Sequence, residues 1–135
     1  MDISESLERI LRREAIVADL FYVVFLDRFP EVRRFFENVD LKRQAVLLSM
    51  ALKVIEQHYL GGYLAADLYL KYLGTKHHQI GIPAALYPMF RDALLITLER
   101  FHGADWDELL AQQWKAAIDF ATETMLEGYE QPYHV

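Results

Sequence analysis

The sequence contains no cysteine, and this absence excludes several kinds of site at once. Without a thiol, a chain forms no disulfide, thiolate zinc site or iron–sulfur cluster, and it cannot attach a prosthetic group through a thioether. Glycine and proline are also scarce, with six and four residues among 135. Because 53% of the residues are hydrophobic and few of them interrupt regular structure, we expect a packed globular domain with long elements.

Basic residues are also fewer than acidic ones, since the sequence has 14 Lys and Arg residues and 20 Asp and Glu residues. Nucleic-acid binders present a basic face, and anionic membrane surfaces attract basic segments, so neither is an expected partner. The most apolar run, residues 15–26, contains Asp19 and is shorter than the about 20 residues that span a bilayer. The N-terminus lacks the apolar segment of a signal peptide. We expect one domain, residues 1–135, in the cytoplasm.

The apolar spacing is helical between nearly all the breaks, and no alternating segment predicts a strand. The expected helices cover residues 4–29 (as one or two helices), 30–36, 40–59, 64–78, 83–101 and from 105 onward. Ser4 or Ser6 would cap the first helix, and Asp40 the helix 40–59. Asp105 would begin the last helix through a capping box. The fold class is all-α.

Apolar stripes predict the buried faces of two of these helices. In the helix 40–59 the stripe is Leu47, Met50, Ala51, Val54 and Ile55. In the last helix it is Leu110, Trp114, Ala117, Ile118, Ala121 and Met125.

Patterns of several common catalytic and metal sites are missing. The sequence has no Glu-x-x-His pair of a di-iron bundle, no His-Glu-x-x-His zinc helix and no glycine-rich phosphate loop. Ser49, the only serine after Ser6, has no evident base nearby in the pattern, so acyl transfer is not expected.

The adjacent residues His77 and His78 cannot both face the core, because successive helical residues are turned by about 100°. Helical steps back from His77 follow an apolar stripe, whereas those from His78 follow a polar one that begins at Gly74 or Thr75. We therefore expect His77 to point inward and His78 outward. The other histidines lie near helix ends or in the tail, where we expect them to be solvated or without partners: His58, His102 and His134.

Tyr22 lies in the most apolar stretch of the chain, where its hydroxyl needs a partner. The neighbouring pair Phe35 and Phe36 adds flat apolar surface. One inward histidine, one buried tyrosine and clustered aromatic rings suit a planar cofactor with one axial ligand, and haem meets that description. The alternatives are a hydrogen-bonded core histidine and a tyrosine that reaches a carbonyl or water.

The stretch LGTKHHQIGI, residues 73–82, resembles the segment around the proximal haem ligand of globins. The resemblance is to bacterial single-domain, flavohaemoglobin-type and globin-coupled-sensor globins, and it places the ligand at His77. LFYVVFLDRFPEVRRFF, residues 20–36, is similar to the distal segment of that family, with Tyr22 at the distal tyrosine position and Phe36 at the haem-stacking phenylalanine.

This resemblance implies a globin fold, a three-over-three helical sandwich, whose first helix is short or fused to the second. It implies haem b held without a covalent bond, with His77 as iron ligand. The residues that it implies around the haem are Tyr22, Phe36, Leu47, Ile82, Tyr87 and Phe90. Tyr87 or a backbone carbonyl would bond the second nitrogen of His77.

The sequence departs from these relatives at two places. Where they often carry a distal Gln or His, a basic stretch occurs; Arg43 fits the haem face best, and a one-residue shift would give Lys42 or Gln44. Arg43 or Lys42 could also meet a haem propionate. Tyr129 falls at the spacing of the glutamate that supports the proximal histidine in flavohaemoglobins.

The function implied is reversible binding of O₂ or another diatomic gas at a five-coordinate iron, for oxygen binding, sensing or NO detoxification. NO dioxygenation would depend on a separate reductase, and sensing on a separate signal transducer, because we expect neither module in this chain. The alternative is a globin-fold signalling module of a stress-response complex that binds no haem.

Overall fold

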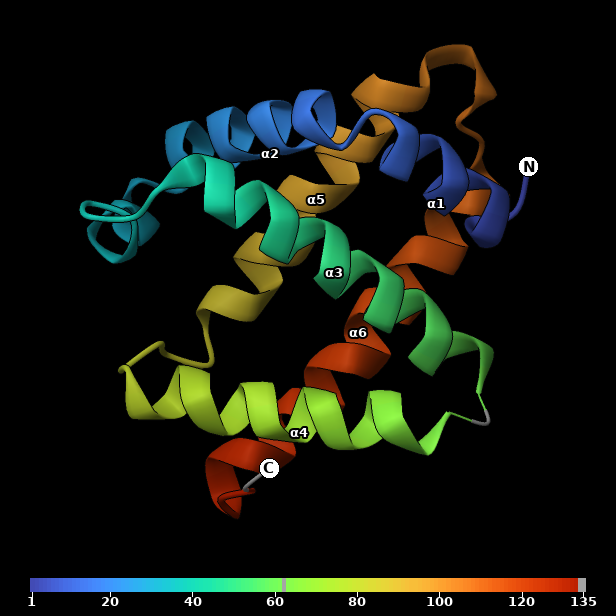
Figure 1. Ribbon diagram of the computed structural model, residues 1–135. Coiled ribbons are helices and arrows are strands. Elements are labelled where there is room, and N and C mark those ends of the chain that lie inside the picture. Colours follow the sequence, from blue (N-terminus) through green and yellow to red (C-terminus); the bar gives the residue numbers. More distant parts are fainter. Residues whose placement is uncertain (62, 134–135) are drawn as a thin grey trace.

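The computed structural model describes residues 1–61 and 63–133 (Figure 1). Its helices are α1 (Ile3–Arg12), α2 (Glu14–Arg28), the 3-10 helix η1 (Pro30–Phe35), α3 (Leu41–Leu60), α4 (Leu64–Gln79), α5 (Leu86–His102), the 3-10 helix η2 (Gly103–Asp105) and α6 (Glu108–Glu130). The described residues contain no strand, and the predicted all-α class is confirmed. None of the described helices is both long and apolar enough to cross a membrane.

The N-terminal segment forms two helices, which settles one of the alternatives left by the sequence. Arg13, with φ −134° and ψ 38°, leaves the helical conformation and separates α1 from α2. Neither Ser4 nor Ser6 caps α1. The side chain of Asp2 does so, because its carboxylate accepts a hydrogen bond from the backbone N–H of Glu5 at 2.9 Å.

The boundaries of α3 and α5 differ in how well the sequence predicted them. Asp40 caps α3 as expected, since its side chain accepts from the N–H of Lys42 at 2.9 Å. Helix α5 begins at Leu86 and not at Pro83, because residues 83–85 form a turn in which the Leu86 N–H donates to the Pro83 carbonyl.

The predicted cap of the last helix was wrong by two residues. Asp107 is the N-cap of α6, and its carboxylate accepts from the N–H of Leu110 at 2.8 Å. Asp105 ends η2, and its carboxylate forms a 2.7 Å ion pair with Arg9 of α1. Through this ion pair, Asp105 links α1 to η2, the segment that precedes α6.

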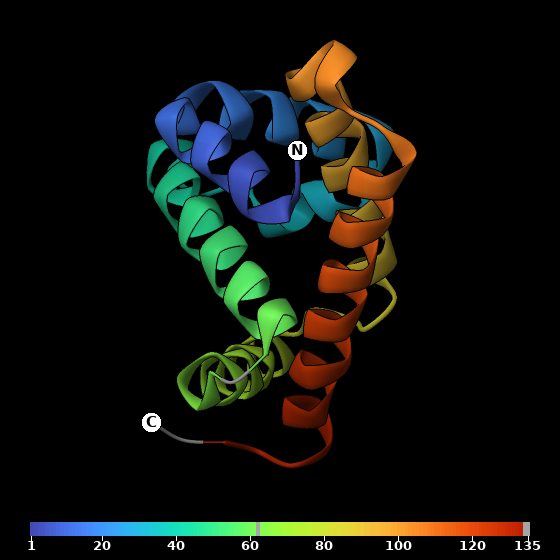
Figure 2. The same cartoon turned by 90° about the vertical axis from the view of Figure 1, so that its right-hand side faces the viewer.

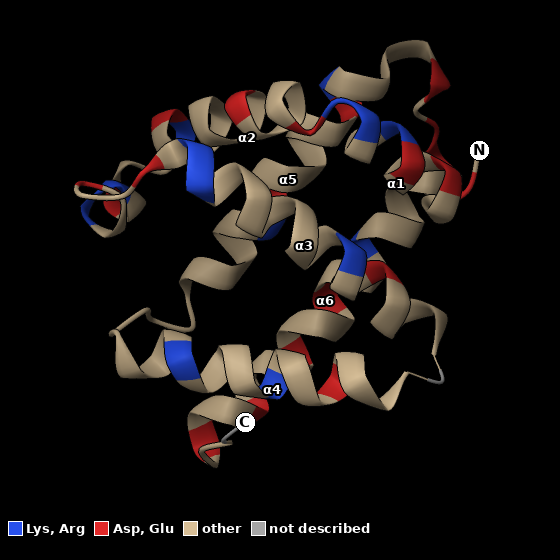
Figure 3. Cartoon of the chain, viewed as in Figure 1, with Lys and Arg blue, Asp and Glu red and all other residues tan. Residues whose placement is uncertain are grey.

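In the view of Figure 1, α2 and α3 lie toward the top of the molecule and α4 toward the bottom, and α5 and α6 run between them. Helix α4 packs on α6, α2 packs on α5, and α3 contacts both α2 and α6. Figure 2 shows α6 running along one side of the molecule and meeting α4 near its C-terminal end. Acidic and basic residues are scattered along the helices (Figure 3).

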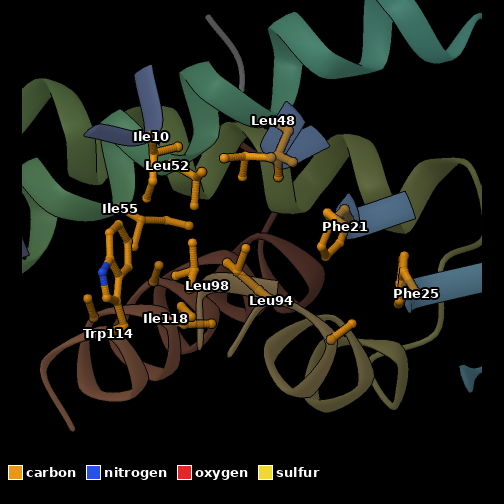
Figure 4. Close-up of a cluster of buried hydrophobic side chains, with 14 of the residues drawn as sticks. Ile10, Phe21, Phe25, Leu48, Leu52, Ile55, Leu94, Leu98, Trp114 and Ile118 are labelled. Atoms are coloured by element: carbon orange, nitrogen blue, oxygen red, sulfur yellow. The ribbon is translucent and has the colours of Figure 1, made fainter. Parts of the chain in front are cut away.

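The core lies where α3, α5 and α6 meet, with Trp114 fully buried (Figure 4). The predicted stripe of α6 is confirmed, because all six of its residues are buried. The predicted stripe of α3 was partly wrong, since Leu47 is 43% and Met50 51% exposed. Its buried apolar residues are Leu48, Leu52 and Ile55.

Helices α4 and α6 approach backbone to backbone at two glycines. A Cβ atom on Gly74 would overlap the Met125 carbonyl group, and one on Gly128 would overlap the Lys71 carbonyl oxygen. The face of α4 that includes Gly74 and Thr75, which the polar pattern predicted to be outward, is thus buried against α6. Thr75 Oγ1 donates to the Gly128 carbonyl at 3.1 Å. Small side chains at this crossing reflect close packing and not solvent exposure.

Candidate functional site

A cavity of about 420 Å³ lies between α2 and α3 on one side and α4 on the other, and residues of η1, α5 and α6 complete its walls. This volume falls in the range of about 300–1,000 Å³ that small-molecule sites occupy. Almost all of its lining is apolar or aromatic. Seven of the eight site residues predicted from the sequence line this cavity: Tyr22, Phe36, Leu47, His77, Ile82, Tyr87 and Phe90.

The mouth of the cavity exposes large apolar side chains. Leu47 is 43% exposed, Ile80 67% and Tyr69 37%, and all three line the cavity. Contiguous apolar surface of this kind marks a place where a ligand or partner binds. The cavity therefore has the surface expected of a site that an apolar group covers.

His77 stands on the last turn of α4 and points into the cavity, as the helical pattern predicts. Its Nδ1 lies 2.9 Å from the hydroxyl oxygen of Tyr87 on α5. Burial lowers the pKa of His77, so the imidazole is neutral at neutral pH. His78 is exposed, also as predicted. A neutral imidazole with one nitrogen held by a neighbour has the other available as a metal ligand.

The chain turns sharply after His77, and this turn brings Ile82 to the cavity. Gly81 has φ +84°, a conformation that glycine adopts without the strain of a side chain. Its N–H donates to the His78 carbonyl at 3.1 Å, and the Ile82 N–H donates to the His77 carbonyl at 3.0 Å. These two bonds form a Schellman cap. The geometry explains the glycine four residues after His77.

Tyr22 is buried on α2, and its ring packs edge to face on Phe36 with the centroids 5.6 Å apart. Its hydroxyl oxygen lies 3.5 Å from both the backbone carbonyl and the side-chain oxygen of Gln44. Burial raises the pKa of Tyr22 to about 12. The hydroxyl therefore keeps its proton over the usual pH range and is a hydrogen-bond donor inside the cavity.

Phenylalanines of α2 and α5, together with Phe36 directly after η1, form one aromatic wall. The ring centroids of Phe21 and Phe90 are 5.3 Å apart, and Phe25 lies 6.1 Å from both Phe36 and Phe90. All four side chains line the cavity. The sequence indicated Phe36 and Phe90, whereas Phe21 and Phe25 were hidden in a uniformly apolar run.

Of the three residues left open at the start of α3, Gln44 lines the cavity. Arg43 and Lys42 are exposed and lie outside the lining. The register of α3 explains this, because Gln44, Leu48 and Ala51 follow one another at helical spacing on the inner face. The preferred placement of Arg43 on that face was therefore wrong by one residue.

Two histidines for which the sequence pattern gave no partner are buried: His102, which was expected in solvent, and His58. Nε2 of His102 lies 2.6 Å from Ser6 Oγ, which also accepts from Trp114 Nε1 at 3.0 Å. Nε2 of His58 lies 3.1 Å from Thr124 Oγ1. His134 lies outside the described residues. The spacing of Ser6 within the buried face of α1 was a signal that could have revealed the first cluster.

Among the described residues, His77 is the one histidine in the lining of the cavity. Among residues 1–61 and 63–133, no group of three His, Asp or Glu side chains could hold a metal ion. In the described part of the chain, the cavity therefore offers a metal one imidazole and no cluster of ligands.

Comparisons with known proteins agree with this geometry. A family model described as Globin matches residues 19–125. The chain is 32% identical over 102 residues to leghemoglobin-1 of Lupinus luteus, covering 75% of this chain and 64% of that protein. It is 33% identical over 91 residues to an anaerobic nitrite reductase of Gossypium hirsutum, covering 65% and 57% of the two chains.

The chain thus spans about three fifths of the length of these curated relatives. The family match includes both walls of the cavity, with Tyr22 on one and His77 on the other. On these grounds the chain belongs to the globin family.

Proposed function

We propose that the chain binds haem b in this cavity without a covalent bond and uses it to bind O₂ or another diatomic gas reversibly. The observation that carries the proposal is His77, a half-buried neutral imidazole in an apolar cavity, with its Nδ1 held by Tyr87. The name of one relative, a leghemoglobin, supports a haem protein.

The residues present fit a haem group. The cavity offers one imidazole, which is the single protein ligand that a haem group would need, because a porphyrin would bring four nitrogen ligands of its own. Phe36, Leu47, Ile82 and Phe90 would pack on the ring, since all four line the cavity. When bound, haem supplies an iron centre that coordinates a diatomic gas. Apolar walls keep water away from that centre.

On the His77 side, the contact with Tyr87 holds the orientation of the imidazole. If the proton resides on Nδ1, it donates to the Tyr87 hydroxyl, and the lone pair of Nε2 remains for the metal. The Tyr87 hydroxyl carries no charge at neutral pH, because burial raises its pKa. The contact with this uncharged hydroxyl therefore orients the His77 imidazole and does not give the ring strong imidazolate character.

On the opposite wall, Tyr22 would donate a hydrogen bond to the gas ligand. Its proton is retained up to a pKa of about 12, and its present partners on Gln44 are at 3.5 Å. A hydrogen bond of this kind stabilises a partly negative ligand, such as bound O₂, over a neutral one. This favours slow O₂ release.

The uses of such a protein that fit best are oxygen binding and sensing. NO detoxification is also consistent with the site but would need electrons from a separate reductase, and sensing would need a separate signal transducer. The likeness to bacterial single-domain globins stays a prediction, as does the cytoplasmic location. A haem-free signalling module is less well supported, because bulky side chains do not fill the cavity of about 420 Å³.

An absorption spectrum tests the proposal. Purified protein supplemented with haem should show a Soret band at about one haem per chain, and His77→Ala should lose it or shift it strongly. His78→Ala is the matched control, because the adjacent side chain is exposed and should leave the band unchanged. A missing band in the unmodified protein, or an unchanged one in His77→Ala, would refute the assignment. Far-UV circular dichroism establishes that each variant is folded.

A further inference from the structure

Helices α3 and α4, which border the cavity, carry a net positive charge in an acidic chain. Together they contain five Lys and Arg residues and two Asp and Glu residues, which gives a formal charge of +3. Because the whole chain carries −6, its other segments together carry −9. Basic bands are visible on both helices in Figure 3. The net charge, from which the sequence predicted no anionic partner, therefore does not describe these two helices.

Two of the basic side chains flank the mouth of the cavity. Arg43 is exposed on α3 and Lys76 on α4, and neither forms an ion pair with a residue in the described part of the chain. Arg43 precedes Leu47 by four residues, and Lys76 precedes Ile80 by four, so each cation shares a helix face with an apolar residue of the mouth. The mouth thus has one unpaired cation on each side.

Bulky apolar groups are exposed between these two cations. Met50 follows Leu47 by three residues on the same face of α3, and half of its surface is exposed. On α4, the Nζ atom of Lys76 lies 5.5 Å from the ring centroid of Tyr72. We call this surface the mouth face, and its residues are Arg43, Leu47, Met50, Tyr69, Lys76 and Ile80.

The combination of side chains on the mouth face matches the surface of an anionic bilayer. Aliphatic side chains and phenol rings are the groups that enter the headgroup layer of a membrane. Lys and Arg bury their aliphatic stems there and hold their charges near the lipid phosphates. A second copy of the chain fits less well, because a symmetric contact would bring Arg43 and Lys76 of both copies together, and like charges repel.

The acidic remainder of the chain does not prevent such a contact. At physiological ionic strength the Debye length is about 8 Å, so charges on the far side of the protein are largely screened from a surface that the mouth face touches. The uneven distribution of charge also orients an approaching molecule, because the basic helices are attracted and the acidic segments are repelled. The approach that the charges favour presents the cavity mouth to the lipid.

From these observations we propose that the mouth face docks on an anionic lipid surface, with the cavity opening toward the bilayer. The contact is peripheral, made by side chains that protrude from α3 and α4 and from the turn after α4. It does not depend on the proposed haem function, since Arg43, Met50 and Lys76 lie outside the cavity lining.

Co-sedimentation of the whole chain with vesicles tests the proposal. The protein should bind vesicles of phosphatidylcholine mixed with phosphatidylglycerol but not vesicles of phosphatidylcholine alone, and added salt should weaken the binding. Arg43→Gln combined with Lys76→Gln should weaken it at least about tenfold, because two cations leave the contact. The matched control, Arg100→Gln combined with Lys115→Gln, removes the same charge at exposed positions outside the cavity lining and should have little effect.

A fluorescent label tests which side of the protein meets the lipid. Because the sequence contains no cysteine, a single introduced thiol can be labelled without side reactions at other thiols. Met50→Cys places the label on the mouth face, and Leu109→Cys places it at an exposed position of α6 outside the cavity lining. On addition of the anionic vesicles, the emission of the label at residue 50 should shift to shorter wavelength, and that at residue 109 should not.

Each contrary result has a definite meaning. If the unmodified protein does not sediment with anionic vesicles, the proposal is wrong. Equal weakening in the two charge variants would assign the binding to overall charge and not to the mouth face. Equal emission shifts at residues 50 and 109 would overturn the orientation. A protein that ignores vesicles but forms dimers that Met50→Gln disrupts would assign the mouth face to a second copy, and capture of an acidic protein in place of vesicles would assign it to that partner.

Discussion

The hydroxyl oxygen of Tyr22 lies 3.5 Å from two oxygens of Gln44, one in the backbone and one in the side chain. Both distances are at the long limit for a hydrogen bond, where the interaction is weak. A buried hydroxyl ordinarily has a closer partner. Tyr22 is therefore a donor that a ligand in the cavity can engage at a shorter distance.

Replacing Tyr22 by Phe should accelerate O₂ release from the haem-bound protein by about tenfold or more, because one hydrogen bond to the ligand is lost. Stopped-flow measurement of O₂ dissociation tests this. Tyr69→Phe, at the mouth of the same cavity, serves as the control and should leave the rate unchanged. An equal rate in Tyr22→Phe and the unmodified protein would exclude the donor role.

Gln44 and Arg43 are neighbours on α3 with different surroundings, which gives a paired test. Gln44→Leu removes one of the two acceptors that compete for the Tyr22 proton, so O₂ release should slow by about two- to threefold. Arg43→Leu should leave the rate unchanged, because that side chain lies outside the cavity lining. The reverse pattern in stopped-flow traces would mean that Arg43 reaches the ligand.

Gly74→Ala should destabilise the protein, although alanine is worth about 1 kcal/mol more than glycine in an ordinary helix. The added methyl group would overlap the Met125 carbonyl group, and backbone atoms cannot rotate away. We expect a loss of about 2–3 kcal/mol in the free energy of unfolding, measured with urea. Ala65→Gly, at an exposed position of the same helix, should cost about 1 kcal/mol or less. A more stable Gly74→Ala protein would contradict this and show that α6 shifts to make room for the methyl group.

The stability of the protein should fall as the pH drops below about 6.5, in part because of His102. Burial lowers the pKa of His102 from its ordinary value of 6.5, and Arg9 lowers it further, whereas Asp105 opposes the change. Between the two pKa values the unfolded chain binds more protons than the folded one, so acid favours unfolding. The stability that His102 contributes is complete above pH 6.5. It is lost as the pH falls through the pKa of His102 in the folded protein.

Urea unfolding at about pH 7.5 and about pH 5, on either side of the ordinary histidine pKa, measures this effect. His102→Gln keeps a neutral side chain near Ser6, and its stability should depend less on pH over this interval than that of the unmodified protein. Equal losses in the two proteins would assign the acid sensitivity to other groups.

Most of the helices could be predicted from the sequence because their signals are local. Apolar spacing and an Asp cap predict α3 from a stretch of about twenty residues. The apolar stripe that precedes His77 likewise predicts that this histidine, and not His78, faces inward. Tyr22 and Tyr87 both line the cavity; the apolar stretch around Tyr22 predicted its burial, whereas Tyr87 was placed by resemblance to a family and not by periodicity.

The errors arose where distant contacts decide. Ser6 lies 108 residues from Trp114 and 96 from His102, so its spacing in α1 indicates that its side chain is buried but does not identify these two partners. Gly74 seemed to belong to a polar face because its contact with α6 lies beyond any helical window. Arg43 was preferred over Gln44 because a helical stripe can be displaced by one residue until the start of the helix is known.

The close crossing of α4 and α6 also affects the order in which the protein can be made. The inner face of the helix that carries His77 is completed by Gly128 and its neighbours, which are synthesised after the helices that form the other walls of the cavity. While the chain emerges from the ribosome, α2, α3 and α5 can assemble before α6 is available. The wall that holds the histidine is therefore finished only once α6 has emerged, and the cavity of a nascent chain stays incomplete until then.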